Sequence, residues 1–173
     1  YIPLIQVFEG LKRDGVDFKI TMSMTPPLCS MLADPLLQDR YDEHLSKLEE
    51  LAELEVERHA HSGHMKYLAE HNAKEFNAVR NTWEKYDRNL ITAFKQFLDS
   101  NNLEIITCGA THGYLPLMKM YPQAVWAQIQ VACEHYEKTF GRPAKGIWLP
   151  ECAYYEGVER MLADAGLRYF LTD

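Results

Sequence analysis

A glutamate and a tryptophan stand close together where a short apolar segment ends. Glu151 follows Pro150 in the segment 146–152, and Trp148 precedes the glutamate by three positions. Pro150 restricts its own φ and helps to aim the following loop away from a strand. This pair suits sugar chemistry, because a retaining glycosidase needs one carboxylate as nucleophile and a second carboxyl group as acid/base. Position alone leaves a structural role equally open, with Glu151 as a helix cap or as the partner of a loop arginine.

A histidine follows another apolar segment in the same way. His112 comes after the β-branched run 103–108 and stands between Gly109 and Gly113. The glycines allow tight turns beside a ligand. A histidine here could bind substrate hydroxyls or orient a carboxylate. The alternative is a loop histidine whose polar atoms are satisfied by the backbone.

Other polar and aromatic side chains stand near the ends of apolar segments. By spacing alone, Asp173 is the natural second carboxylate. The alternatives are a residue that hydrogen-bonds on the ligand side, or a cap for a following helix. Tyr154 and Tyr155 could add a stacking surface beside Glu151, although core packing is equally open for one of them. Glu104 stands early in its segment, so we expect it to bind a structural partner.

A cluster of histidines raises the possibility of a metal site, but its spacing argues against one. On a helix, His59 and His61 would lie on nearly opposite faces. The pair 62–63, Ser-Gly, indicates a break before His64, so we interpret the segment as a solvated linker. The sequence contains no Gly-x-Ser-x-Gly, Walker or dinucleotide motif.

Strands and helices alternate along most of the chain. β-type segments are expected over 18–24, 103–108, 146–149 and 168–172, and helical periodicity over 1–13, 41–58, 73–98, 122–136 and 157–165. Such alternation predicts crossover connections and a parallel sheet. We therefore expect an α/β fold, either part of a β/α barrel or an open sheet, with a long helical insertion at about 36–99. Ligands would bind at the carboxyl ends of the strands.

Composition narrows the class of protein and its partners. The net charge is −7, with acidic residues spread along the chain, which argues against a nucleic-acid partner. No apolar run approaches the roughly 20 residues of a membrane span. The four cysteines have no Cys-x-x-Cys spacing and are interpreted as reduced thiols, which favours the cytoplasm. The chain begins without Met, inside an expected helix, and ends directly after an expected strand, so both ends look cut.

Three segments, 103–117, 146–154 and 165–173, resemble the motifs of glycoside hydrolase family 57, in the form found in its 1,4-α-glucan branching enzymes. The resemblance runs over nearly the whole chain. It implies a partial (β/α)7 barrel with Glu151 as the catalytic nucleophile, and neither a metal nor an organic cofactor. The substrate-binding residues that we expect are His112, Gly113, Tyr114, Trp148, Cys152, Tyr154 and Asp173.

The resemblance also implies an activity. A branching enzyme cleaves an α-1,4 link of an α-1,4-glucan and transfers the released segment to a 6-hydroxyl. The family's first motif is expected before Tyr1 and its acid/base aspartate beyond Asp173, so Asp173 is reassigned to the lining of the site. We expect this piece alone to be inactive, and to self-associate through open sheet edges. The alternatives are a 4-α-glucanotransferase or α-amylase-like hydrolase of the same family, and a non-catalytic carbohydrate-binding module.

Overall fold

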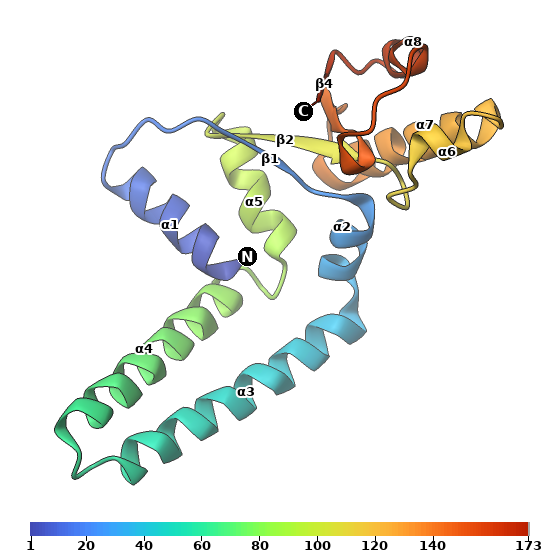
Figure 1. Cartoon of the computed structure of the whole chain (residues 1–173). Coiled ribbons are helices and arrows are strands. Elements are labelled where there is room, and N and C mark those ends of the chain that lie inside the picture. Colours follow the sequence, from blue (N-terminus) through green and yellow to red (C-terminus); the bar gives the residue numbers. More distant parts are fainter. Residues whose placement is uncertain (173) are drawn as a thin grey trace. The chain divides into compact units, whose positions relative to one another are not determined.

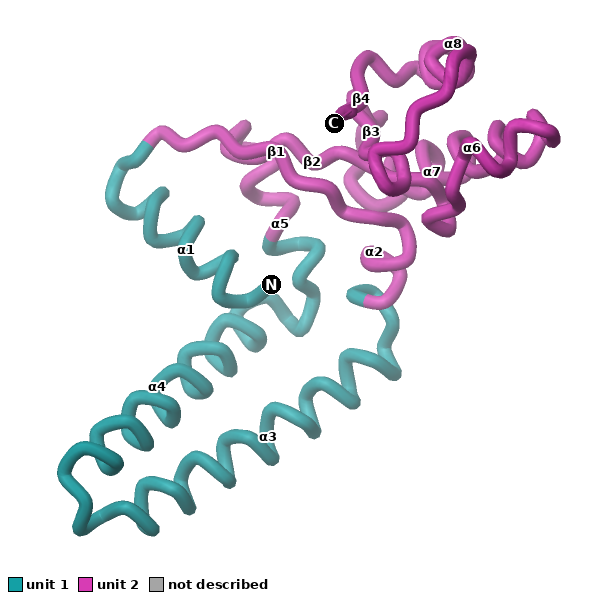
Figure 2. The backbone as a smooth tube through the Cα atoms, viewed as in Figure 1, with its two compact units in different colours: residues 1–16, 32–93 teal, residues 17–31, 94–173 magenta. Residues whose placement is uncertain are grey.

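The computed structural model describes residues 1–172, which form two compact units (Figures 1 and 2). Residues 1–16 and 32–93 make the helical unit, and residues from 17 to 31 and from 94 onward make the sheet unit. Two helices cross the boundaries between these residue ranges, namely α2 (Pro26–Ala33) and α5 (Leu90–Asp99). No helix in the described part of the chain is both long and apolar enough to cross a bilayer.

Four parallel strands form the sheet of the sheet unit. They follow the chain order and are β1 (Ile20–Ser23), β2 (Leu103–Cys108), β3 (Gly146–Trp148) and β4 (Tyr169–Leu171). The predicted α/β fold with parallel strands and helical crossovers is confirmed. Because all four strands run the same way, their carboxyl ends lie along one edge of the sheet.

Helices follow the strands of the sheet unit along the chain. They are α6 (Leu115–Met118), α7 (Pro122–Phe140) and α8 (Val158–Asp164), with a 3-10 turn, η1 (Pro150–Cys152), directly after β3. The α7 helix has a proline in its first turn and ends at Gly141, whose φ of 74° suits a glycine. It packs against β2, where the hydroxyl of Tyr136 donates a hydrogen bond of 2.8 Å to the carbonyl of Ile105.

The helical unit is built on a long helical hairpin. It contains α1 (Ile2–Arg13), α3 (Pro35–Arg58) and α4 (Gly63–Lys85), and α3 packs against α4. Asp34 caps α3 by accepting a hydrogen bond of 3.0 Å from the backbone nitrogen of Leu37. The break expected at residues 62–63 is present, since α3 ends at Arg58 and α4 starts at Gly63.

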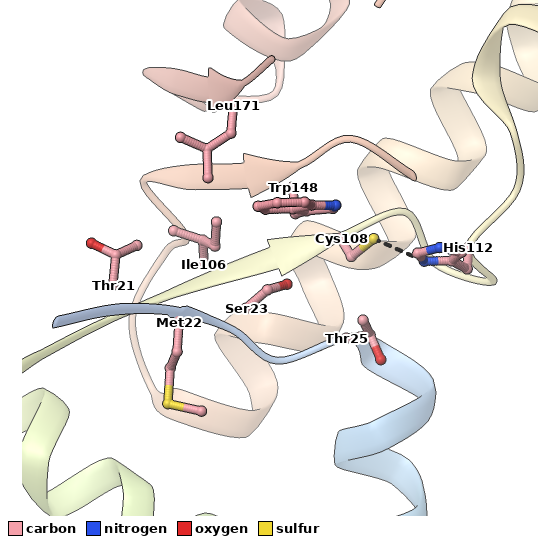
Figure 3. A pocket seen from close by; sticks show the side chains of 9 residues that line it. All are labelled: Thr21, Met22, Ser23, Thr25, Ile106, Cys108, His112, Trp148 and Leu171. Atoms are coloured by element: carbon pink, nitrogen blue, oxygen red, sulfur yellow. Dashed lines mark hydrogen bonds between the residues drawn. The ribbon is translucent and has the colours of Figure 1, made fainter. Parts of the chain in front are cut away.

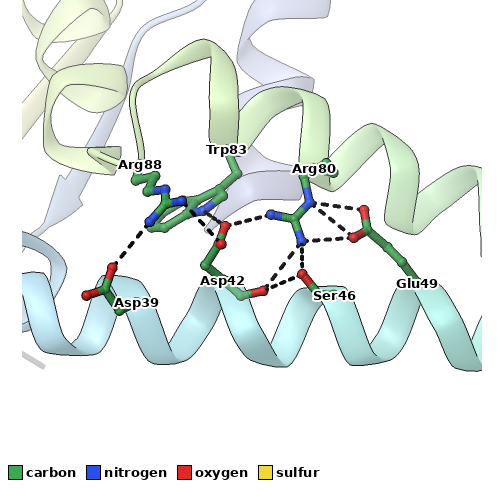
Figure 4. Close-up of polar contacts among 7 residues, drawn as sticks. All are labelled: Asp39, Asp42, Ser46, Glu49, Arg80, Trp83 and Arg88. Carbon is green, nitrogen blue, oxygen red and sulfur yellow. Dashed lines mark hydrogen bonds and ion pairs between the residues drawn. The ribbon is translucent and has the colours of Figure 1, made fainter.

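An arginine of α4 joins the two helices of the hairpin (Figure 4). Arg80 binds Asp42 at 2.6 Å, and it binds both carboxylate oxygens of Glu49 at 2.8 to 3.1 Å. Burial raises the pKa of Asp42, but hydrogen bonds from Arg80 and Trp83 lower it by more, so this pKa lies below its ordinary value.

One expectation about secondary structure was wrong. The single helix expected over 73–98 is in fact two helices, because Asp87 and Arg88 adopt positive φ angles of 49° and 64° after α4. Asn89 then caps α5 by accepting from the backbone nitrogen of Ile91 at 3.1 Å. No helix was predicted at 26–33, where two prolines start α2, since a proline fits the first turn of a helix.

Candidate active site

The two candidate residues that follow neighbouring strands meet in the structure. Glu151 lies in the turn after β3, and His112 lies in the loop after β2. Nε2 of His112 is 3.0 Å from Oε1 of Glu151. The Glu151 side chain is 73% exposed, so its second oxygen remains accessible. Glu151 does not cap α8, where Glu159 instead accepts a hydrogen bond of 2.7 Å from the backbone nitrogen of Gly157.

Both members of this pair have an unusual backbone conformation. His112 has a φ of 57° and Glu151 a φ of 56°, and Cys152 follows with 53°. Side-chain-bearing residues in this left-handed region cost of order 1 to 2 kcal/mol each. Hydrogen bonds close both turns, because His112 N donates to Gly109 O at 3.0 Å and Cys152 N donates to Leu149 O at 2.8 Å. The strained backbone is therefore held in place by turns on either side of the pair.

Gln128 of α7 fixes the histidine loop, and sequence reasoning missed it. Its side-chain oxygen accepts from Thr111 N at 2.9 Å, and its side-chain nitrogen donates to Thr111 Oγ1 at 2.7 Å. The backbone carbonyl of Gln128 accepts a third hydrogen bond, of 3.0 Å, from Ala110 N. A signal for Gln128 existed, because it is a polar residue beside Ile129 in the apolar stripe of its helix.

Two glycines of this loop are required by close packing. A Cβ on Gly109 would lie 3.1 Å from Cγ of Pro150, and one on Gly113 would lie 3.0 Å from Sδ of Met118. Gly109 thus lets the histidine loop approach the turn that carries Glu151. Packing against Met118 accounts for the glycine at position 113, which was predicted to bind substrate.

One face of the sheet lines a pocket of about 370 Å³ (Figure 3). Cys108 pairs in register with Trp148, and Trp148 with Leu171, so these three side chains share that face. Trp148 is 37% exposed and borders the pocket, as does His112. The Oγ of Ser23, another lining residue, is buried and has no hydrogen-bond partner among the described residues.

The other predicted substrate residues that the structure describes do not line this pocket. Tyr114 precedes α6 and is 45% exposed. Tyr154 stacks on Phe170 with ring centroids 5.7 Å apart, and its hydroxyl donates to Glu159 at 3.1 Å. Asp173 lies outside the described residues. The structure therefore unites His112, Trp148 and Glu151 more closely than the tyrosines.

Cys108 is a second residue that sequence reasoning missed. Its Sγ lies 3.2 Å from Nδ1 of His112, on the side of the ring away from Glu151. Burial raises the pKa of the Cys108 thiol to about 11, opposed by a hydrogen bond from the Gly109 backbone and aided by the charge of Glu151. The thiol therefore keeps its proton near neutral pH.

The histidines considered for a metal site lie in the helical unit. His59 follows α3 and pairs with Glu55 at 3.1 Å. Within residues 1–172, no three histidine, cysteine, aspartate or glutamate side chains are grouped closely enough to hold a metal ion. The four cysteines form no disulfide in that range.

Comparison with known proteins identifies relatives that share this fold. A 1,4-alpha-glucan branching enzyme of Thermococcus kodakarensis is 34% identical over 100% of this chain and 27% of its own length. The crystal structure of the alpha-amylase AmyC from Thermotoga maritima has a TM-score of 0.96 at 42% identity, over 100% of this chain and 33% of that one. The GH57-type branching enzyme of Pyrococcus horikoshii gives 0.91 at 33% identity, over 98% of this chain and 35% of that one.

The chain thus spans only about a third of the length of these relatives. Enzymes of this family have a (β/α)7 barrel, so the prediction of a partial barrel is confirmed, with four parallel strands that do not close. All 173 residues match the family model for glycosyl hydrolase family 57. The chain belongs to glycosyl hydrolase family 57.

Proposed function

We propose that the natural protein containing this chain is a retaining enzyme acting on α-1,4-glucan, with Glu151 as its nucleophile. The observation that carries the proposal is the contact of 3.0 Å between His112 Nε2 and Glu151 Oε1, at the carboxyl ends of β2 and β3. A carboxylate that is exposed, oriented by a neighbour and placed at this edge of a parallel sheet suits attack on a bound sugar.

The chemistry follows from the two oxygens of Glu151. His112 holds Oε1, which leaves Oε2 to attack the anomeric carbon of the donor sugar. The bond from that carbon to the leaving oxygen breaks, and this oxygen takes a proton from an acid/base carboxyl group. We propose that an aspartate outside this chain supplies that proton.

Branching completes the cycle with a second displacement. A 6-hydroxyl of an acceptor glucan attacks the glycosyl ester and gives its proton to the same acid/base group. The new link is α-1,6, and the Glu151 carboxylate is regenerated. The branching relatives at 33% and 34% identity favour this outcome, as do the motif forms in segments 103–117 and 146–154.

We propose that the glucan is bound by the residues around this pair. Trp148 offers an exposed aromatic ring at the pocket, and Tyr114 and Tyr154 are partly exposed nearby in the sheet unit. Sugar rings present apolar faces that pack on such surfaces. The full set is His112, Gly113, Tyr114, Trp148, Cys152, Tyr154 and Asp173.

We also propose that the protein acts in the cytoplasm. The cysteines form no disulfide in the described range, which supports this location.

Hydrolysis of α-glucan is the second candidate. The likeness to AmyC, called an alpha-amylase, is higher in identity, at 42%, than the likeness to the branching enzymes. The two reactions share the first step and differ in whether water or a 6-hydroxyl attacks the ester. Their distinction therefore depends on the acceptor and not on Glu151.

A covalent trap tests the nucleophile without relying on the acid/base group. A 5-fluoro-α-glucosyl fluoride carries its own leaving group, so Glu151 alone can displace fluoride and form a slowly hydrolysed ester. Peptide mass spectrometry of the natural protein should place the adduct on Glu151. Glu151→Gln should give no adduct and lower activity on amylose by at least about 10³-fold. Wild-type activity in that variant would defeat the assignment and favour a non-catalytic carbohydrate-binding role.

Product analysis on amylose separates the candidate reactions. Proton NMR and debranching should reveal new α-1,6 links if the protein is a branching enzyme. A rise in reducing ends without such links would identify hydrolysis. Redistribution of chain lengths, with neither change, would identify a 4-α-glucanotransferase.

A further inference from the structure

A buried thiol lies behind the candidate nucleophile, connected to it through a histidine. Cys108 is the last residue of β2 and is fully buried, and its Sγ is 3.2 Å from His112 Nδ1 (Figure 3). The other ring nitrogen of His112 is 3.0 Å from Glu151 Oε1. The side chains therefore form a continuous chain of hydrogen bonds from the interior to the exposed carboxylate.

The direction of these hydrogen bonds follows from their chemistry. An ionised carboxylate only accepts, so Nε2 of His112 carries the hydrogen that Glu151 Oε1 receives. In a neutral imidazole, Nδ1 is then an acceptor, and the protonated thiol of Cys108 can donate to it. In a charged imidazolium, Nδ1 would also be a donor, and it would face a sulfur that accepts weakly. The contact with the thiol therefore selects the tautomer in which Nε2 carries the hydrogen and Nδ1 accepts one.

We propose that Cys108 is a positioning residue that holds His112 as the neutral Nε2–H tautomer and so keeps Glu151 reactive as a nucleophile. This proposal rests on the proposed role of Glu151. A charged His112 would form a stronger, charge-assisted hydrogen bond with the carboxylate and reduce its tendency to attack. A neutral His112 orients Glu151 without that cost.

The shape of the loop does not depend on Cys108, because other contacts fix it. Gln128 binds Thr111 through two hydrogen bonds and Ala110 through a third. Loss of the thiol should therefore leave the histidine in place while it removes the hydrogen-bond donor to Nδ1. Within residues 1–172, the titratable groups in hydrogen-bonding contact with His112 are Cys108 and Glu151.

The first test reads the tautomer directly. Nitrogen-15 NMR of the natural protein, labelled at histidine, distinguishes a protonated from an unprotonated ring nitrogen, and His112→Gln assigns the signals. We expect Nδ1 to be unprotonated at neutral pH in the wild type. In Cys108→Ala, the Nδ1 signal should move, because its hydrogen-bond donor is lost, whereas Nε2 should keep its hydrogen.

The second test uses kinetics on amylose. Cys108→Ala should lower kcat on amylose by about 10-fold with little change in KM. Its circular dichroism should match that of the wild type, whereas a folding defect would change it. Cys108→Ser keeps a donor and should stay within about 3-fold of the wild type. Cys133→Ala is the matched control, since Cys133 lies on α7 and is half-buried.

Two outcomes would overturn the proposal. One is a wild-type His112 that is protonated at Nδ1 at neutral pH. The other is a Cys108→Ala protein whose His112 Nδ1 signal and kcat are unchanged. If Glu151→Gln were fully active, the proposed function would fail instead, and the NMR result would still show whether Cys108 sets the tautomer.

Discussion

Replacing Gly146 by alanine should destabilise the sheet unit, because the ring of Tyr169 occupies the space that a side chain would need. A Cβ on Gly146 would lie 2.4 Å from Cζ of Tyr169, 2.5 Å from Cε2 and 2.8 Å from the hydroxyl oxygen. Carbon atoms in good contact are about 3.5 Å apart, so the two groups must separate by about 1 Å. The two residues pair directly in register between β3 and β4, which leaves little freedom for this movement.

The magnitude can be worked out from what must give way. If the ring moves, Tyr169 loses part of its packing and its polar interaction with Glu104, together about 1 to 1.5 kcal/mol. If β3 moves, its register contacts with β4 are strained at a similar or greater cost. Alanine restricts the unfolded chain and offsets about 0.5 kcal/mol. We therefore expect the free energy of unfolding to fall by about 2 kcal/mol.

Urea unfolding monitored by circular dichroism should measure this change. Tyr169→Leu removes the outer ring atoms, so in that background Gly146→Ala should cost less than about 0.5 kcal/mol. Gly63→Ala is the matched control, since nothing lies within 4 Å of its Cβ position in the first turn of α4. It should stabilise by about 0.4 to 1 kcal/mol. Equal costs of Gly146→Ala in both backgrounds would refute the steric argument.

Two further predictions concern the hairpin and the sheet edges. Arg80→Met should lower the free energy of unfolding by about 2 kcal/mol, because Asp42 and Glu49 lose their partner. Arg58→Met is the control, since it removes the exposed ion pair with Glu55 and should lower the free energy of unfolding by less than about 0.5 kcal/mol. Folding lowers the pKa of Asp42, so the stabilisation that this carboxylate contributes is complete above its unfolded pKa of about 3.9. That stabilisation should be lost as the pH falls through the folded pKa. Unfolding curves measured at several pH values should show a smaller loss in Arg80→Met. We also propose that the 173-residue chain self-associates, since β1 and β4 each pair on one side only among the described residues; light scattering that shows a monomer at high concentration would contradict this.

Much of the sheet could be predicted because its strands are short runs rich in apolar residues, and glycine or proline closely follows β2 and β3. The helices were harder where one pattern fits two structures. Tyr86 and Leu90 keep the helical phase of their neighbours, so the apolar stripe continues across a break that only the positive φ angles of Asp87 and Arg88 reveal. Periodicity reports which residues face the core, and it does not report where the backbone turns.

In the candidate site, too, the sequence predicted which residues take part but not the backbone geometry that brings them into contact. Strand ends identified Glu151 and His112, because the carboxyl ends of parallel strands lie together. Their contact depends on left-handed backbone at both residues, which residue type does not predict. Cys108 could be placed on the face of Ile106 by alternation, but its hydrogen bond depends on how the loop returns the histidine ring. Long-range geometry of this kind is set by tertiary packing.

The pairing of β1 with β2 has a consequence for the order of folding. Ile20 pairs with Leu103 about 80 positions later, whereas β3 and β4 pair across only about 20. Closing the longer loop costs more entropy and slows the search, so β1 should join the sheet after β2, β3 and β4 have paired. The α3–α4 hairpin forms from local contacts and shortens the effective loop before that step. In refolding, protection of amides from hydrogen exchange should therefore appear in β3 before β1.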